Sequence, residues 1–533
     1  MDAGWRQFKV WALCFVALAA LGAACRTGAA ASPPLPAAIM IDEQPATVTA
    51  LLDLWVDPLN GSDGNSGTSR ADALATISAA WAQIPRATPL SEQGYRIQLL
   101  PGDYAESAFP LYWEERYGTA AAPIEIVAAE GAGTVRLHGF LNFFDVRYVS
   151  LIDLYVENGG DVFHCEQCSH FTLQGLRLDG GERQAHETVK INQSQYITIT
   201  GSDIFGSYEN AIDFVAVQYG TISDNRLHDA DDWCIYLKGG SAYFRIERNI
   251  IYNCGTGGFT AGQGTGFEFM SAPWLQYETY DIKFVNNIIH DTEGAGMGVN
   301  GGYNILLAYN TLYRVGARSH LIEVVFGSRT CDGNSATCAD HLAQGGWGTT
   351  LPEDEPIPDR NIYIYNNVIY NPPGYQSEWQ HFAIHGPRTP GETSNIPAPA
   401  VTDENLQIRG NWIWNGPKEH PLGIGDGQGC EASNPTCNPT QLLADNSINQ
   451  DEPGFIKAAT GDFRLVGNVV PLLASNIPTF GAWTPAVPAG TFANEVSHDF
   501  DQQPRRADSL PGAYAGADGE EARFFIYLPG LAN

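Results

Sequence analysis

A short pattern of apolar and polar positions recurs between Val149 and Trp414. Each copy reads apolar, any, apolar, any, any, usually Asn, any, apolar, and the nine copies begin at Val149, Phe171, Ile197, Gly220, Phe244, Ile282, Ile305, Ile362 and Leu406. Their starts are separated by 22, 26, 23, 24, 38, 23, 57 and 44 residues. Alternating apolar positions predict strands, and a base period of about 23 residues with three longer intervals predicts a solenoid. One repeat cannot bury its apolar face alone, so the repeats are expected to stack.

Six asparagines occupy the same position of this pattern: Asn225, Asn249, Asn287, Asn310, Asn367 and Asn411. They predict an internal ladder at a turn, in which each amide bonds to the coils above and below. This repeated sequence pattern resembles the parallel β-helix repeat of the pectate-lyase-like superfamily. The resemblance implies an all-β chain, folded as a single-stranded right-handed parallel β-helix with an N-terminal capping helix and a C-terminal capping segment.

The remaining pattern predicts the two ends and the inserted loops. Ala73 to Ile84 is amphipathic, and a helix there would cover the open N-terminal end of the solenoid. Segments between 451 and 514 resemble the closing segment of secreted β-helix proteins, which implies a C-terminal cap. Inserts fall between the repeats at 255–263, 271–280, 328–359, 371–379 and 387–403. Such loops are expected to gather along one flank and wall a groove.

These boundaries give the expected organisation of the chain. It consists of a signal peptide at 1–31, a linker at 32–51, the N-terminal cap and first coils at 52–140, the repeats with their insertions at 141–416, the last coils and C-terminal cap at 417–516, and a tail at 517–533.

Composition and the first residues concern compartment and partners. Lys plus Arg total 29 against 60 Asp plus Glu, a formal charge of −31, which argues against a nucleic-acid partner. Arg6 and Lys9 precede the apolar run 10–24, as in an export signal. The stretch ending at Cys25 resembles a bacterial lipoprotein box with its Leu one position too far away, so cleavage near Ala31 is the alternative. We expect an exported monomer, either secreted or held at the cell surface by an N-terminal lipid.

Eight cysteines remain besides Cys25 and Cys14, an even number that suits an oxidising compartment. Cys331 with Cys338, and Cys430 with Cys437, lie in polar loops and predict local disulfides that close those loops. Two further pairs are left open between a disulfide and buried thiols: Cys234 with Cys254, and Cys165 with Cys168. A zinc site at Cys165 and Cys168 is disfavoured, because no second cysteine pair has zinc spacing.

A second strand lies between successive copies of the pattern, and its outward positions carry the ionisable groups. The expected outward row is His164, Lys190, Asp213, Tyr236, Lys238, Glu268, Asn300, Glu323 and His385. Neighbouring coils stand about 4.8 Å apart, so the row forms a ladder along one face. A solvated sheet face is also polar, but it more often carries Thr, Ser and Gln. A functional groove is therefore the favoured interpretation over a plain charged face.

The first chemistry that fits the row is β-elimination from an acidic polysaccharide. A base removes the proton beside a carboxylate, which a cation must neutralise. Lys238 is the predicted base, with Lys190 also catalytic and with Tyr236, Asn300 and His164 binding substrate. The stretch 229–238 is similar to family 9 polysaccharide lyases, which implies Ca²⁺ ligands at Asp213, Asp231 and Asp232, although one extra residue separates the acidic pair from Lys238. An ordinary ion pair of Lys238 with Asp213 or Glu268 is the structural alternative.

The second chemistry is glycoside hydrolysis by paired carboxylates. Glu268 and Glu323 are expected two coils apart, at about 9.6 Å, the upper end of the inverting range. His385 is a further acid–base candidate. Four tryptophan positions, Trp274, Trp347, Trp379 and Trp412 or Trp414, either stack on sugar rings or pack against the inserted loops. A third alternative is a surface or glycan-binding protein without catalysis.

Overall fold

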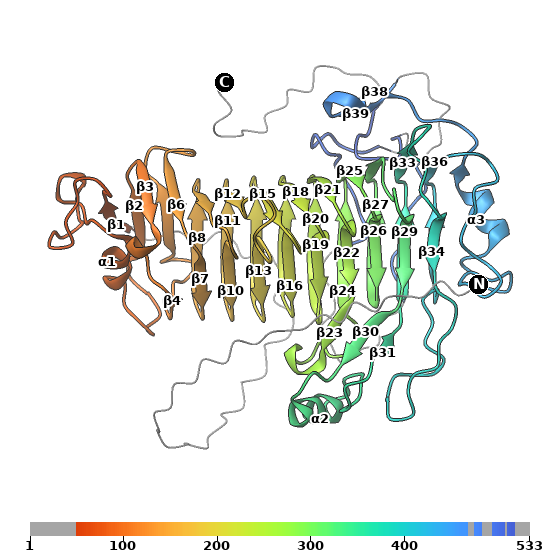
Figure 1. Ribbon diagram of the computed structural model, residues 1–533, viewed down its shortest axis with the longest axis horizontal. Coiled ribbons are helices and arrows are strands. Elements are labelled where there is room, and N and C mark those ends of the chain that lie inside the picture. Colours follow the sequence, from red (N-terminus) through yellow and green to blue (C-terminus); the bar gives the residue numbers. More distant parts are fainter. Residues whose placement is uncertain (1–49, 467–473, 482–492, 507–508, 517–533) are drawn as a thin grey trace. The chain divides into compact units, whose positions relative to one another are not determined.

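The computed structural model describes residues 50–466, 474–481, 493–506 and 509–516, all of which belong to one compact unit. Their strands stack into three long parallel sheets (Figure 1). The predicted signal peptide, nearly all of the linker, Cys25 and the predicted tail lie outside the described residues.

The central coils each contribute one strand to each long sheet, and the recurring sequence pattern spans a sheet A strand, a bend and a sheet B strand. Sheet A runs β1 (Leu51–Val56), β2 (Gly94–Leu99), β5 (Ile124–Ala128), β8 (Arg147–Ile152), β11 (Ser169–Gln174), β14 (Gln195–Thr200), β17 (Gln218–Ser223), β20 (Ser241–Glu247), β24 (Thr279–Val285), β27 (Gly302–Ala308), β32 (Arg360–Tyr365) and β35 (Gln407–Arg409). Sheet B runs β3 (Gly102–Ala105), β6 (Val135–His138), β9 (Tyr155–Glu157), β12 (Arg177–Asp179), β15 (Asp203–Ser207), β18 (Arg226–Ala230), β21 (Ile250–Cys254), β25 (Ile288–Thr292), β28 (Thr311–Tyr313), β33 (Val368–Asn371), β36 (Trp412–Asn415) and β37 (Ser447–Ile448).

Sheet C is the second strand predicted for each coil. It runs β4 (Trp113–Glu114), β7 (Leu141–Phe144), β10 (Phe163–Glu166), β13 (Val189–Asn192), β16 (Ile212–Val215), β19 (Trp233–Lys238), β22 (Gly257–Gly262), β26 (Ala295–Asn300), β29 (His320–Val325) and β34 (Gln380–Ile384). Apolar side chains of all three sheets alternate inward and form one continuous core. The chain is therefore a parallel β-helix, as the repeat predicted.

The asparagine ladder is confirmed, and it stands at the bend between sheets A and B. Each Nδ2 donates to the Oδ1 of the next asparagine, from Asn225 to Asn411, at 2.8–3.2 Å. The ladder continues for one further step to Asn446, at 2.8 Å. These amides are buried and also bond to backbone groups of adjacent coils, so each bend is locked to its neighbours without water.

The predicted N-terminal helix is shorter than expected, running as α1 (Ile77–Ala82) after Thr76, whose hydroxyl accepts the Ala79 N–H at 3.1 Å. Its Trp81 ring packs edge-on against Trp113, with ring centroids 5.1 Å apart. Figure 1 shows α1 beside β1 and β2 at one end of the coils. Two short 3₁₀ helices, η1 (Arg70–Asp72) and η2 (Glu106–Ala108), lie in the same region.

Three inserts leave the solenoid at the corner between sheets C and A, at 263–278, 327–359 and 385–406. We call the first two together the lobe. It contains η3 (Phe267–Phe269), α2 (Ser335–Ala343) and the small sheet of β23 (Gly264–Gly266), β30 (Gly327–Thr330) and β31 (Glu355–Ile357). Figure 1 shows these elements projecting from one flank of the coils. Of the five predicted inserts, 271–280, 328–359 and 387–403 fall at this corner, whereas 255–263 largely forms β22 and 371–379 lies between sheets B and C.

The C-terminal part differs from the expected terminal cap. Helix α3 (Pro439–Asp445) packs beside β35 and β37 at the last coil. The later residues instead cover the sides of earlier coils. Strands β38 (Phe455–Lys457) and β39 (Asp462–Leu465) form an antiparallel pair, and η4 (Ala458–Thr460) lies between them in the chain. The pair packs on the solenoid through a contact of Phe463 with Ile288. Phe480 and Val496 cover an apolar patch on sheet A around Tyr363.

All four cysteine pairs form disulfides: Cys165–Cys168, Cys234–Cys254, Cys331–Cys338 and Cys430–Cys437. The two loop-closing bridges were predicted, and the two open pairs are bridged as well. Over the described ranges, no helix has the length and apolar character needed to cross a bilayer.

Candidate functional site

The outward face of sheet C carries one row of side chains in strict register. The row is Asn142, His164, Lys190, Asp213, Tyr236, Thr260, Gly298, Glu323 and Ala383. Lys238 and Asn300 lie one outward position further along their strands, and His385 follows the end of β34. Sequence alternation therefore placed eight of the nine predicted side chains on or beside this face, spread over two adjacent rows.

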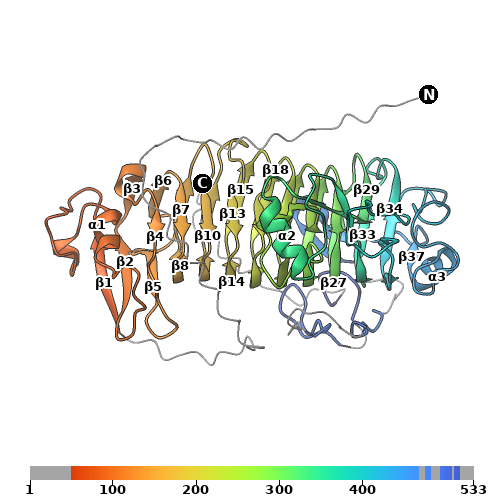
Figure 2. The same cartoon turned by 90° about the horizontal axis from the view of Figure 1, so that it is seen from below.

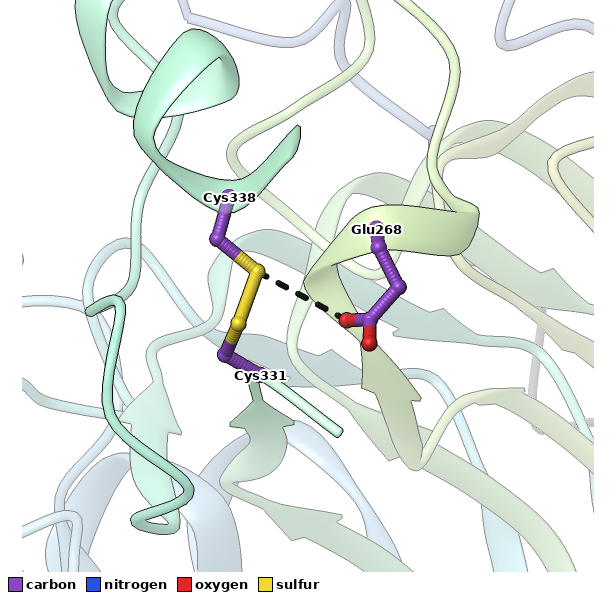
Figure 3. A group of neighbouring side chains, drawn as sticks. All are labelled: Glu268, Cys331 and Cys338. Carbon is purple, nitrogen blue, oxygen red and sulfur yellow. Dashed lines mark hydrogen bonds between the residues drawn. A yellow bond between two sulfur atoms is a disulfide. The ribbon is translucent and has the colours of Figure 1, made fainter. Parts of the chain in front are cut away.

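Glu268 is the exception, because it does not belong to sheet C. The sheet C strand of that coil is the glycine-rich β22, which presents Thr260, whereas Glu268 lies on η3 in the lobe. Its carboxylate accepts the N–H groups of Asp332 at 3.2 Å and Asn334 at 3.3 Å, and it contacts Cys338 Sγ at 3.6 Å (Figure 3). Glu268 thus braces the loop before α2, and the predicted Glu268–Glu323 hydrolytic pair is wrong.

Two lysines converge on one buried aspartate in the middle of the face. The chain has only six lysines: Lys9, Lys190, Lys238, Lys283, Lys418 and Lys457. Lys190 donates to Asp213 Oδ2, and the Nζ of Lys238 lies 3.6 Å from the same oxygen. Asp213 is 1% exposed, whereas both lysine side chains keep about a fifth of their surface accessible. The Lys238 ammonium also lies 4.1 Å from the centre of the Tyr236 ring, a cation–π contact.

Electrostatics keep this cluster charged. Burial opposes ionisation of Asp213, but Lys190 and Lys238 outweigh it and hold the carboxyl pKa below its ordinary value. Burial likewise opposes the charged form of Lys190, yet Asp213 and Glu187 raise the lysine pKa above its usual range. Lys190 therefore remains a cation at neutral pH. The cluster thus places two ammonium groups against the carboxylates of Asp213 and Glu187, and both lysines reach the outward face of an otherwise acidic protein.

His164 lies next to Lys190 on the preceding coil. Its Nδ1 is 2.9 Å from Asn142 Oδ1, and its Nε2 is 3.3 Å from Asn192 Nδ2. Burial, followed by the nearby Lys190 charge, lowers the His164 pKa, so the ring is neutral near pH 7. Asn300 is nearly buried and faces the Thr260 hydroxyl at 3.4 Å. Of these two predicted substrate contacts, His164 is the one beside the lysine cluster.

A second group lies four coils from Asp213, or about 19 Å at the usual strand spacing. Glu323 Oε2 is 3.0 Å from His320 Nε2. His385 Nδ1 faces the Arg388 guanidinium at 3.3 Å, and burial followed by that charge lowers the His385 pKa. Glu323 and His385 thus share the face with the lysine cluster but are too remote to act on the same bond.

The predicted calcium set does not come together. A Ca²⁺ ion needs several oxygens converging at about 2.3–2.6 Å. Asp213 already faces two lysines, and Asp231 pairs with Arg183. The half-buried Asp232 has a raised pKa, chiefly because of burial. Within the described ranges, only two groups of three potential metal ligands approach within 4.8 Å of one another, and neither contains these aspartates. One includes both sulfurs of the Cys331–Cys338 disulfide, which are not free to bind metal.

The other group consists of Asp161, His186 and Glu187. Through Glu187 it adjoins the lysine cluster. His186 Nδ1 is 2.7 Å from Glu187, and Nε2 is 3.0 Å from Glu209, so both ring nitrogens are engaged. Glu187 in turn lies 3.4 Å from Lys190 Nζ. Neither glutamate was predicted, although each lies two or three residues before a sheet C strand, where the turn brings it to the same edge as the row.

Replacing His186 by glutamine should make stability less dependent on pH. Hydrogen bonds to Glu187 and then Glu209 raise the His186 pKa from 6.5 to about 10. A raised folded-state pKa contributes stability that is fully present below the unfolded value and is lost as pH rises through the folded value. The difference in Tm between wild type and His186→Gln should therefore be larger at pH 6 than at pH 10. His498→Gln, at an exposed histidine, serves as control; an equal difference at both pH values would contradict the assignment.

Comparisons with known proteins agree with this architecture. A family model described as the right-handed β-helix region matches residues 161–336, a third of the chain. A search of curated proteins found no match to the chain. Among solved structures, pectate lyase Pel9A shares 14% identity over 88% of this chain and 97% of its own, with a TM-score of 0.45. A rhamnogalacturonan lyase shares 12% over 67% and 87% (TM-score 0.40), and a glycoside hydrolase shares 9% over 74% and 98% (TM-score 0.40). At such identities the likeness does not extend to chemistry, which has to be argued from the site.

Proposed function

We propose that this chain is a carbohydrate-active protein that binds an acidic polysaccharide along sheet C and cleaves it by β-elimination. The observation that carries the proposal is the convergence of Lys190 and Lys238 on Asp213 at the outward face. A polyanionic chain needs a cationic site, and the protein as a whole, at −31, does not supply one. The lysine cluster supplies it locally.

The two lysines suit different parts of the elimination. Lys190, held cationic by Asp213 and Glu187, would neutralise the carboxylate of a uronic acid residue, which stabilises the charge that develops when the adjacent carbon loses its proton. Lys238, as the free amine, would take that proton. The electron pair of the broken C–H bond forms a double bond, the bond to the glycosidic oxygen breaks, and the departing oxygen takes a proton from water.

An assay with two readouts tests this proposal. The protein is incubated with a panel of polyuronates and neutral polysaccharides, and both ultraviolet absorbance of an unsaturated product and new reducing ends are followed. Elimination predicts that the two signals rise together on a polyuronate. Reducing ends without absorbance would indicate hydrolysis, and binding without either signal would indicate a glycan-binding protein; both results would overturn the proposal.

Removing divalent cations should leave the elimination rate unchanged within about twofold. The ammonium of Lys190 lies where a cation would have to approach Asp213, and the three predicted ligands do not converge. The rate is measured after dialysis against a chelator and again after Ca²⁺ is restored, with product absorbance as readout. A tenfold loss that Ca²⁺ reverses would show that the metal, rather than Lys190, neutralises the substrate carboxylate.

Among the described residues of the outward row, the carboxylates do not have the spacing that the hydrolytic alternative requires. Asp213 and Glu323 stand about 19 Å apart, outside the inverting range of about 6.5–9.5 Å. We also propose that the protein acts outside the cytoplasm, because its four disulfides persist in oxidising compartments.

A further inference from the structure

A separate pocket of about 300 Å³ lies where the inserts meet the first residues of strands β24, β27 and β32 of sheet A. Its aromatic walls are Tyr277, Tyr303 and Trp347, and its polar groups come from Gln276, Arg360 and Glu404. These residues belong to five separate stretches of the chain. Of the four tryptophan positions marked by the sequence, Trp274 and Trp412 are buried in packing, whereas Trp347 faces this pocket.

The walls of the pocket are held in place by the solenoid. Tyr280, Tyr303 and Arg360 are register partners on successive coils. The Tyr280 hydroxyl accepts the N–H groups of Gln276 at 2.7 Å and Tyr277 at 2.8 Å, which fixes the loop that carries Tyr277. The Tyr277 ring centre lies 4.8 Å from both Tyr303 and Trp347, at angles of 52° and 57°. The walls are therefore formed before any ligand arrives, which lowers the entropy lost on binding.

The charges at the pocket cancel. Arg360 Nη2 lies 3.4 Å from Glu404 Oε1, and both side chains are about half exposed. These are the only ionisable side chains besides tyrosines among the pocket-lining residues. An anionic ligand would have to compete with Glu404 for the arginine, and a purely apolar ligand would remove both charges from water without replacing their hydrogen bonds. The lining therefore favours an uncharged ligand that has one apolar face and several hydroxyl groups.

We propose that this pocket binds a neutral pyranose ring of a glycan and holds it without catalysis. The C–H face of such a ring packs on Trp347, the least buried of the three aromatic walls, and its hydroxyls reach Gln276, Arg360 and Glu404. The pocket is proposed to bind an uncharged ring, whereas the lysine cluster is proposed to bind an anionic one. The pocket thus supplies a second point of attachment, and it does not depend on the chemistry proposed for sheet C.

Calorimetric titration with three neutral hexasaccharides, cellohexaose, mannohexaose and laminarihexaose, tests the proposal on the full chain. At least one should bind saturably, and Trp347→Ala should weaken that binding at least tenfold. Val401→Trp, which fills the pocket from a half-buried lining position without removing an aromatic wall, should weaken it equally. Trp379→Ala, at a tryptophan outside the pocket that is 58% exposed, and Lys238→Ala should bind as wild type does.

Three results would overturn the proposal that this pocket binds a neutral sugar. They are no saturable binding of any hexasaccharide, unchanged binding in Val401→Trp, or an equal loss in Trp379→Ala. Because Lys238→Ala abolishes the proposed elimination but leaves this pocket intact, failure of one proposal is distinguishable from failure of the other.

Discussion

Replacing Lys238 by alanine is expected to lower the elimination rate by about 10²–10⁴-fold, the usual contribution of a general base. Its Nζ lies on the outward face, 3.6 Å from Asp213 Oδ2 and 4.1 Å from the Tyr236 ring centre. The other described lysines lie elsewhere: Lys283 is buried beside Phe480, Lys418 follows β36, and Lys457 lies on β38. The loss should fall on kcat, because Lys190 still binds the substrate carboxylate.

The matched lysine variants separate the two roles. Lys190→Ala should raise KM as well as lower kcat, because it removes the cation that holds the substrate in both the ground and transition states. Lys457→Ala, at an exposed lysine far along the chain, should leave both constants unchanged. A Lys238→Ala rate within twofold of wild type would exclude Lys238 as the base and reduce it to an ion-pair partner of Asp213.

Side-chain alternation was enough to predict which residues lie on the outward face of sheet C. A shift of one residue in the register of a strand would have put all its apolar side chains outside and its polar ones inside. Lys190, Asp213, Tyr236 and Glu323 all project outward in register, as expected. The asparagine ladder was equally predictable, since a buried amide at a repeating turn can be satisfied only by its neighbours. The last member of the ladder, Asn446, was not predicted, because it follows α3 and does not stand in a copy of the apolar pattern.

The coil around Glu268 was misassigned for a physical reason. Glycine is depleted in strands, so Gly257–Gly262 was interpreted as a loop and the next apolar run as the strand. In the structure the Trp233 ring lies across the face of sheet C at this point. A Cβ at Gly257 would lie 2.2 Å from that ring, and one at Gly298 would lie 3.1 Å from it. The glycines are there because an aromatic side chain from a neighbouring coil occupies their outward space, and only tertiary structure reveals this.

The three aspartates predicted as Ca²⁺ ligands lie apart for a different reason. Spacing along the chain placed Asp231 and Asp232 near Lys238, but it did not reveal their partners. Arg183 reaches Asp231 from the turn before sheet C, and Lys190 reaches Asp213 from the preceding coil. Two cations from earlier coils therefore take up the carboxylates that the pattern assigned to a metal.

Replacing Arg329 by alanine is expected to destabilise the lobe by about 3–5 kcal/mol, the cost of leaving a buried charge without its partner. Arg329 and Glu278 are fully buried, and the guanidinium donates to Glu278 Oε1 from Nε at 3.0 Å and from Nη2 at 2.6 Å. The same guanidinium bonds the carbonyls of Leu275 and Trp347. One side chain therefore joins the two inserts of the lobe to each other, and its partner Glu278 connects them to the solenoid. Denaturant unfolding and hydrogen exchange over 263–278 and 327–348 measure the effect.

An exposed ion pair provides the matched control. Arg318 and Glu293 lie 3.1 Å apart, with side chains 56% and 68% exposed, so Arg318→Ala should cost less than about 1 kcal/mol. The double variant Arg329→Met, Glu278→Gln should recover part of the loss, because it removes the unpaired buried charge. Glu278 Oε2 also accepts the N–H of Gly239 at 3.0 Å, directly after Lys238. Arg329→Ala should therefore slow elimination as well, although Arg329 lies outside the lysine cluster; a destabilisation no greater than that of Arg318→Ala would show that the lobe is held by its other contacts.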